Sequence, residues 1–224
     1  MRTRVILASL LTFVVASWWL IAEEAGKPVN RDEVKKQFDA GNFKVAYDGY
    51  RKLALDAKND PKKVSEDLAM AVQSLRSLGR ISEFDELVEA AIKAHGTNWR
   101  LLRGAALQYV SVDQWGFIVA GKFERGSHRG GGKYVTSTPR DRVRALQLMQ
   151  QAVTLAAKDD SKSEVARFYL EFASILQAVE AWRLQALTDL TVLPDYEEGN
   201  MGWGGRGRFR GGFAPGGENK GAPV

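Results

Sequence analysis

The sequence contains no cysteine. Disulfides, thiolate nucleophiles, cysteine-ligated metals and lipid attachment through an amino-terminal cysteine are therefore excluded, and packing alone must stabilise the fold. Histidine is almost as scarce: His95 and His128 are the only two, and neither belongs to an HExxH motif or a regular carboxylate cluster. No serine stands in a nucleophile-elbow motif. The sequence thus predicts a protein that is not an enzyme, with no catalytic residues, no metal and no cofactor.

A phosphate-binding loop is also missing, although Lys133 follows three glycines. The phosphate-loop pattern needs a glycine six residues before the lysine and a serine or threonine directly after it. Those two places hold Ser127 and Tyr134. The stretch also connects two predicted helices, whereas a nucleotide loop follows a strand. Nucleotide binding is therefore not expected.

The amino-terminal segment, residues 1–25, has the pattern of a targeting sequence. A positive start with Arg2 and Arg4 precedes an uncharged, mostly apolar run over 5–22, which ends before Glu23 and Glu24. These are the parts of a signal peptide or an amino-terminal membrane anchor. We therefore expect an exported protein, periplasmic or anchored in the cell envelope, with the inner membrane as the site of anchoring.

The sequence is compatible both with cleavage of this segment and with its retention as an anchor. Signal peptidase prefers small residues at the third and first positions before the cut, where Val14 and Ala16 fit but Leu20 fits poorly. The pair Trp18-Trp19 would instead suit an uncleaved anchor, since tryptophan favours the membrane interface.

Two stretches repeat one pattern 38 residues apart. Each has a glycine, followed two, five, nine and twelve residues later by positions that share one helix face. The first set is Gly41, Phe43, Ala46, Tyr50 and Leu53, and the second is Gly79, Ile81, Phe84, Val88 and Ala91. The pattern predicts paired helices joined at a glycine turn.

This arrangement resembles the tetratricopeptide repeat, whose second helix begins with such a glycine followed by an aromatic residue. Trp99 and Leu102 match the family's spacing at the start of a third pair. The resemblance implies a module that binds or positions other proteins. The alternative is an all-α bundle of ordinary amphipathic helices.

We expect an all-α fold, a tetratricopeptide-like helix-hairpin array. Helical patterns cover 31–39, 43–57, 61–77, 81–94, a stretch from Asn98, a stretch from 140 or 141 to 157, and 164–190. The last is either one long helix or two helices joined near Gln177, and it is expected to cap the array.

A long insertion, residues 115–139, interrupts the third pair. Two β-prone ends flank a glycine-rich basic tip, which predicts a β-hairpin or a long exposed loop, acting either as a functional element or as a spacer. Aromatic and arginine side chains often anchor recognition. The candidate partner-binding residues are Trp115, Phe117, Phe123, Arg125, His128 and Arg129.

The insertion, the helix start at 141–149 and the stretch 181–199 together resemble the amino-terminal region of large exported bacterial α2-macroglobulin-family proteins, in which a helical segment precedes β-sandwich domains. The likeness covers roughly residues 100–224. It implies either a fragment of such a protein or a short relative, with another protein or a following domain as partner. The family's thioester requires a cysteine, which this chain lacks.

The carboxyl end, residues 194–224, predicts a disordered Gly/Arg-rich linker after a helical domain at 26–193. Arginines and phenylalanines among its glycines resemble an RGG segment, so the alternative function is polyanion or nucleic-acid binding through the loop and tail. Export argues against nucleic acid as the partner, and a net charge of +5 decides nothing. The favoured prediction is a non-catalytic protein–protein interaction scaffold.

Overall fold

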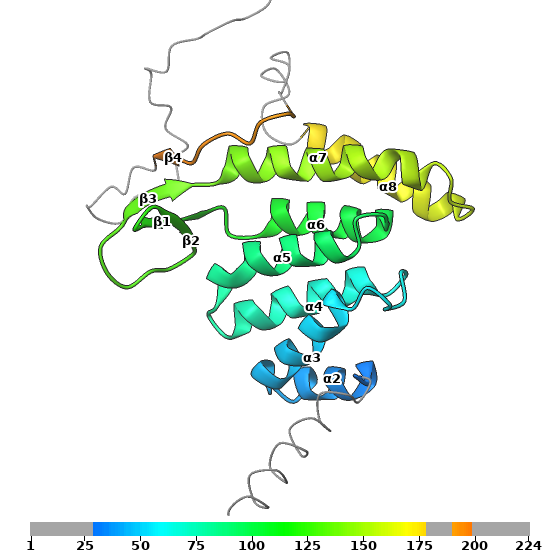
Figure 1. The fold of residues 1–224 in the computed structure, drawn as a ribbon, viewed down its shortest axis with the longest axis horizontal. Helices are drawn as coiled ribbons and strands as arrows, with labels where there is room; N and C mark the ends of the chain where they lie inside the picture. The colour runs from blue at the N-terminus through cyan, green and yellow to red at the C-terminus, as the bar shows by residue number, and fades with distance from the viewer. Residues whose placement is uncertain (1–28, 178–189, 199–224) are drawn as a thin grey trace, which may run out of the picture.

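The computed structural model describes residues 29–177 and 190–198, which form a mostly helical molecule with a small antiparallel sheet (Figure 1). The amino-terminal elements are α2 (Arg31–Asp39), α3 (Phe43–Leu55), α4 (Val64–Ser77), the 3₁₀ turn η1 (Ile81–Glu83), α5 (Phe84–Ala94) and α6 (Trp99–Ser111). They are followed by β1 (Trp115–Val119), β2 (Lys122–Arg125), β3 (Lys133–Thr136), α7 (Thr138–Ala156), α8 (Lys162–Gln177) and β4 (Glu197–Glu198).

The helical content is as the sequence predicts, while several helix ends differ from prediction. Helix α4 begins at Val64 rather than at Pro61, because 61–63 form a separate turn in which the Asp60 carboxylate accepts from the Lys62 amide at 2.9 Å. Helix α7 begins at Thr138, earlier than expected, with a proline in its first turn. Proline is tolerated there because backbone N–H groups in the first turn of a helix make no hydrogen bond within the helix.

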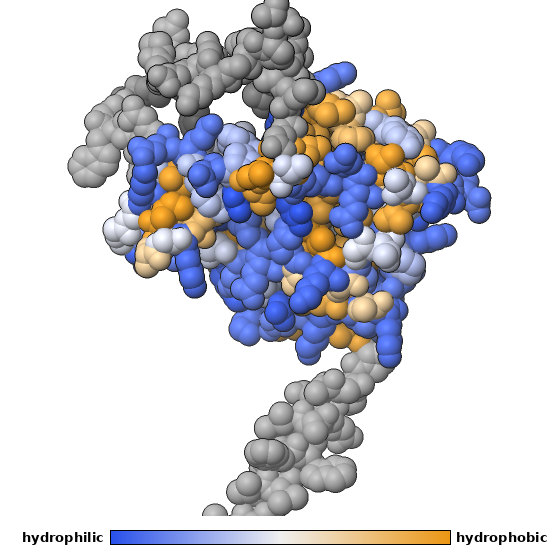
Figure 2. Space-filling view, turned by 45° about the horizontal axis from the view of Figure 1, so that its top comes forward, coloured by the Kyte–Doolittle hydropathy of each residue, from blue (hydrophilic) through white to orange (hydrophobic). Residues whose placement is uncertain are grey.

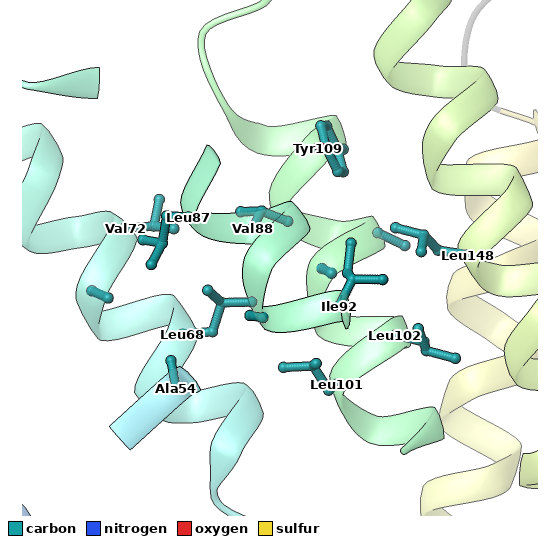
Figure 3. Close-up of a cluster of buried hydrophobic side chains, with 14 of the residues drawn as sticks. Ala54, Leu68, Val72, Leu87, Val88, Ile92, Leu101, Leu102, Tyr109 and Leu148 are labelled. Carbon is teal, nitrogen blue, oxygen red and sulfur yellow. The ribbon is translucent and has the colours of Figure 1, made fainter. Parts of the chain in front are cut away.

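The helices lie one beside the next across the molecule, from α2 and α3 at one end to α7 and α8 at the other (Figure 1). The most extensive packing joins α6 to α7 and α3 to α4. Leu68 of α4, Leu101 of α6 and Leu148 of α7 are fully buried and belong to one continuous apolar core, part of which is drawn in Figure 3. That core extends over all the helices from α2 to α8.

The two predicted glycine turns have the same geometry. Gly41 and Gly79 adopt φ of +81° and +65°, each directly after the residue that caps the carboxyl end of its helix, Ala40 for α2 and Leu78 for α4. At each, the next amide closes the helix end: Asn42 N donates to Gln37 O, and Arg80 N donates to Leu75 O, both at 2.9 Å. This is the Schellman helix end, which favours glycine because a Cβ disfavours positive φ.

The insertion forms a sheet with strand order β2-β1-β3-β4, all pairs antiparallel. Ala120 and Gly121, both at positive φ, make the two-residue turn between β1 and β2. The hairpin prediction is therefore extended by two further strands, and the sheet lies beyond one end of α6 and α7 (Figure 1).

The described residues 190–198, here called the return segment, run along α7 to the sheet (Figure 1). Gln147 donates to the Leu190 carbonyl at 2.7 Å and Arg140 to the Pro194 carbonyl at 3.0 Å, before Glu197 and Glu198 pair with β3. The sequence predicts a linker from 194, but residues 194–198 are held on α7 and the sheet.

The remaining boundary predictions lie outside the described residues. These are the targeting segment 1–25, the part of the predicted 164–190 helix after Gln177, and the tail from 199. Within 29–177 and 190–198, no helix has the length and apolarity needed to span a membrane.

Candidate functional site

The sheet has two different faces, and its register determines which residues lie on each. Phe117 of β1 is paired with Glu124 of β2 and Tyr134 of β3, so these three side chains point the same way. Gly116 is paired with Arg125 and Val135 and directs those residues to the opposite face. Arg125 and Val135 are buried, so this second face is the one that packs on the helices.

The first face carries a cluster of rings, which we call the outer aromatic face: Trp115, Phe117, Tyr134 and His128. The Phe117 ring centre is 6.5 Å from that of Trp115, 5.7 Å from Tyr134 and 6.0 Å from His128. All four residues are half-buried, so each ring supports its neighbours while keeping part of its surface in solvent. Figure 2 shows hydrophobic side chains at this sheet end of the molecule, on the left.

The glycine-rich loop 126–132 places His128 beside this face. Nδ1 of His128 lies 2.7 Å from a Glu124 carboxylate oxygen, and a Cβ at Gly130 would come within 3.2 Å of the imidazole. Gly132 is similarly close to Phe117. The glycines therefore allow the loop to fold back tightly over the sheet.

The inner face is fixed by Arg125, whose side chain is 1% exposed. Its guanidinium makes two hydrogen bonds to Asp141 of α7, at 2.7 and 2.9 Å, and two to Asp85 of α5, at 3.0 and 2.7 Å. Nη1 also donates to the Ser137 hydroxyl at 3.0 Å and to the Asp113 carbonyl at 2.8 Å. We call Arg125, Asp85 and Asp141 the arginine clamp.

The clamp keeps Arg125 charged. Burial by itself lowers the pKa of Arg125, but hydrogen bonds to Asp141 and Asp85 outweigh that effect, so the pKa lies above its ordinary value. Rings of Phe84 and Phe123 lie 5.0 and 5.2 Å from the guanidinium carbon and add cation–π contacts.

Arg125 is therefore not a surface contact, in contrast to its place among the predicted partner-binding residues. Its guanidinium is fully occupied by groups of its own chain, and its role is to attach β2 to α5 and α7. Phe123 is likewise turned inward, stacked on Tyr196 of the return segment at 4.3 Å between ring centres. Sequence alone gives no local sign of either contact.

The other predicted residues are accessible. Trp115, Phe117 and His128 come together on the outer aromatic face, and Arg129 is exposed in the adjoining loop. Tyr134 completes the face and was not among the predicted residues. Strand alternation could have indicated it, because Tyr134 is the cross-strand partner of Phe117.

Within residues 29–177 and 190–198, no three histidine, aspartate or glutamate side chains are grouped to hold a metal ion. His95 is buried, with Nε2 placed 3.1 Å from the Ala54 carbonyl oxygen. This is a structural contact between α3 and the end of α5.

Comparison with known protein families, with curated proteins and with solved structures finds no match.

Proposed function

We propose that this chain is a non-catalytic protein–protein interaction scaffold of the exported compartment, comparable to the helical amino-terminal part of an α2-macroglobulin-family protein. The observation that carries the proposal is the outer aromatic face on an insertion clamped to the helices. Aromatic side chains supply large contact area at low entropic cost when they are already held in place.

The helix pairs support the tetratricopeptide-like part of the proposal. Gly41 and Gly79 follow the first helices of two successive pairs, α2 and α4, in the same conformation. The positions five, nine and twelve residues after each glycine are buried in both copies, as for Tyr50 and Val88, whereas Phe43, two residues after Gly41, is half-buried. A repeated unit of this kind buries its apolar face on its neighbours and leaves loops free for recognition.

The large residue in the second copy of the repeat, Phe84, also supports a functional insertion. Phe84 stands where the first copy has Ala46, and its ring packs edge-on to Tyr109 at 5.3 Å while lying beneath the Arg125 guanidinium. The departure from a small residue thus occurs where the insertion is attached. It supports an insertion that belongs to the fold rather than a spacer.

Polyanion binding is less favoured by the described surface. Two of the basic residues beside the outer aromatic face have acidic neighbours, since His128 is close to Glu124 and Lys133 is paired with Glu198. A stacking platform for nucleic acid would need an unbalanced positive groove along the aromatic rings. The Gly/Arg-rich tail that motivates this alternative lies outside the described residues.

Site-specific photocrosslinking tests the proposal. A photoreactive phenylalanine analogue replaces Phe117 in the full chain, expressed in its native cells, and adducts are identified after irradiation. We expect a discrete protein adduct from position 117. The matched control replaces Val45, an apolar residue that is 57% exposed and belongs to α3, a helix at the end of the stack away from the sheet (Figure 1).

Absence of any adduct at 117, or the same adducts from both positions, would contradict a specific partner at this face. An immunoblot of the native cell envelope with antibody against residues 31–193 separates two forms of the proposal. A band near 24.8 kDa, or slightly below it, indicates a free-standing scaffold. A band several times larger indicates a helical front end joined to further domains.

A further inference from the structure

A second site lies between α6, α7 and α8, separate from the outer aromatic face. It is a cavity of about 280 Å³. Leu107, Val110 and Ile175 supply apolar walls, and the polar lining comprises Gln114, Thr138, Arg142, Glu171 and Ser174. Small-molecule pockets usually measure about 300–1,000 Å³ and combine apolar walls with a few polar groups, so this cavity suits a small, fragment-sized group.

Arg142 is the unusual member of this lining. Its Nε is the only buried side-chain nitrogen or oxygen without a hydrogen-bond partner in the described part of the chain. Its Nη2 makes one long bond, 3.3 Å, to the Leu176 carbonyl. Arg125, by comparison, directs all three guanidinium nitrogens to acceptors. A buried donor without an acceptor costs free energy, so Arg142 is poised to gain from an incoming acceptor.

Among residues 29–177 and 190–198, the charges around the cavity do not pair with Arg142. Glu171, the one acid in the lining, is held by two hydrogen bonds from Arg103 of α6. Arg142 itself is in no ion pair among the described residues. An anionic group entering the cavity would therefore meet a guanidinium whose charge no carboxylate of the described residues has already balanced.

We infer that this cavity binds an apolar carboxylate: an apolar body of about the size of a phenylalanine side chain, lying against Leu107, Val110 and Ile175, with its carboxylate on Arg142. Guanidinium and carboxylate form charge-assisted, often bidentate pairs, and a small turn of the side chain brings its unused N–H groups to the ligand. Such a group is either a free acid or the carboxyl-terminal residue of a polypeptide.

Backbone amide NMR of the full chain tests this site with phenylbutyrate as the free acid and N-acetyl-Ala-Phe as the peptide acid. We expect saturable chemical-shift changes confined to the cavity lining for at least one acid. The acid with the lower dissociation constant shows whether the ligand is a free acid or the carboxyl-terminal residue of a polypeptide. The uncharged probes, phenylbutyramide and N-acetyl-Ala-Phe amide, should bind roughly tenfold more weakly because they lack the carboxylate.

Two variants localise the binding. Arg142→Gln should weaken the acid by about tenfold or more, whereas Arg167→Gln, which removes an exposed arginine of α8, should leave it unchanged. Val110→Trp fills the cavity from its exposed edge and should abolish binding of both acids. Shifts that do not saturate, equal affinity for acid and amide, or full binding by Arg142→Gln would each overturn the inference. None of these outcomes involves Phe117, so this test is independent of the crosslinking test.

Discussion

The helical stack and the sheet insertion are held together by opposite means. The stack buries side chains such as Leu68 and Leu148, whose contacts are numerous and non-directional. The insertion is attached through Arg125, the largest fully buried side chain in the described protein, whose contacts are directional and charged. Apolar packing tolerates changes that conserve volume, whereas a buried ion network requires a particular geometry. The insertion should therefore be the more sensitive region to conservative change.

The largest expected effect comes from Arg125→Met. The substitution leaves Asp141, which is nearly inaccessible, without its cation, and breaking a buried pair in this way costs about 3–5 kcal/mol. Urea denaturation of the variant and of wild type measures this loss in the free energy of unfolding. Arg129→Met, an exposed change in the same insertion, should fall within about 0.5 kcal/mol of wild type.

Two further changes sharpen this result. Arg125→Lys keeps the charge but loses the planar fork that reaches Asp85 and Asp141 together, so most of the destabilisation should persist. Restoring partial stability with Asp141→Leu in the Arg125→Met background would show that the cost arises from the stranded carboxylate. If Arg125→Lys matched wild type, the clamp would act by charge alone and the comparison would fail.

In the stack, Leu68→Ala should cost about 2–5 kcal/mol, because it removes a fully buried side chain and leaves a cavity. Leu68→Met, which nearly conserves volume, should cost less than about 1.5 kcal/mol. The contrast with Arg125→Lys is the direct test of the two regions. Leu170→Ala, at a site 73% exposed, is the matched control and should be close to neutral.

The glycine turns give a smaller effect. Gly79→Ala places a Cβ at φ +65°, which costs about 1–2 kcal/mol although no atom lies within 4 Å to clash. Gly131→Ala, also in open space but without a positive φ, should change the free energy of unfolding by less than about 0.5 kcal/mol. Equal costs at the two glycines would rule out backbone conformation as the cause.

The smallest effect concerns pH. Hydrogen bonds from Arg100, Trp99 and the Ser161 amide lower the pKa of Asp159 below its ordinary value. A carboxylate with a lowered folded-state pKa contributes stability above the unfolded-state pKa, near 3.9, and loses it as pH falls through the folded-state pKa. The stability difference between wild type and Asp159→Asn should therefore narrow below about pH 4.

Urea denaturation at several acidic pH values measures the difference in the free energy of unfolding between wild type and Asp159→Asn. Asp160→Asn, which alters an exposed neighbouring carboxylate with no side-chain ion pair in the described protein, serves as control. A gap for Asp159→Asn that stays constant with pH would mean that its charge is not what stabilises the start of α8.

Sequence periodicity predicts the stack better than the insertion, for a physical reason. Helices and glycine turns depend on residues three to twelve positions apart, so Gly41 and Gly79 are visible in the sequence. The acids that hold Arg125 lie 16 and 40 positions away, and no local spacing connects them. The sequence predicts Trp115 and Phe117 as partner-binding residues because aromatic and arginine side chains often anchor recognition. The inward turn of Arg125 depends on tertiary contacts alone.

The return segment gives the molecule a definite mechanical linkage. A pull on the chain at Glu198 would first meet the two-residue pairing with β3, then the stack of Tyr196 on Phe123 and the Arg140 bond to Pro194. Beyond these, the load would pass through β2 and Arg125 to α5. Tension on the return segment would thus reach the helical stack from the side, at the arginine clamp and along α7.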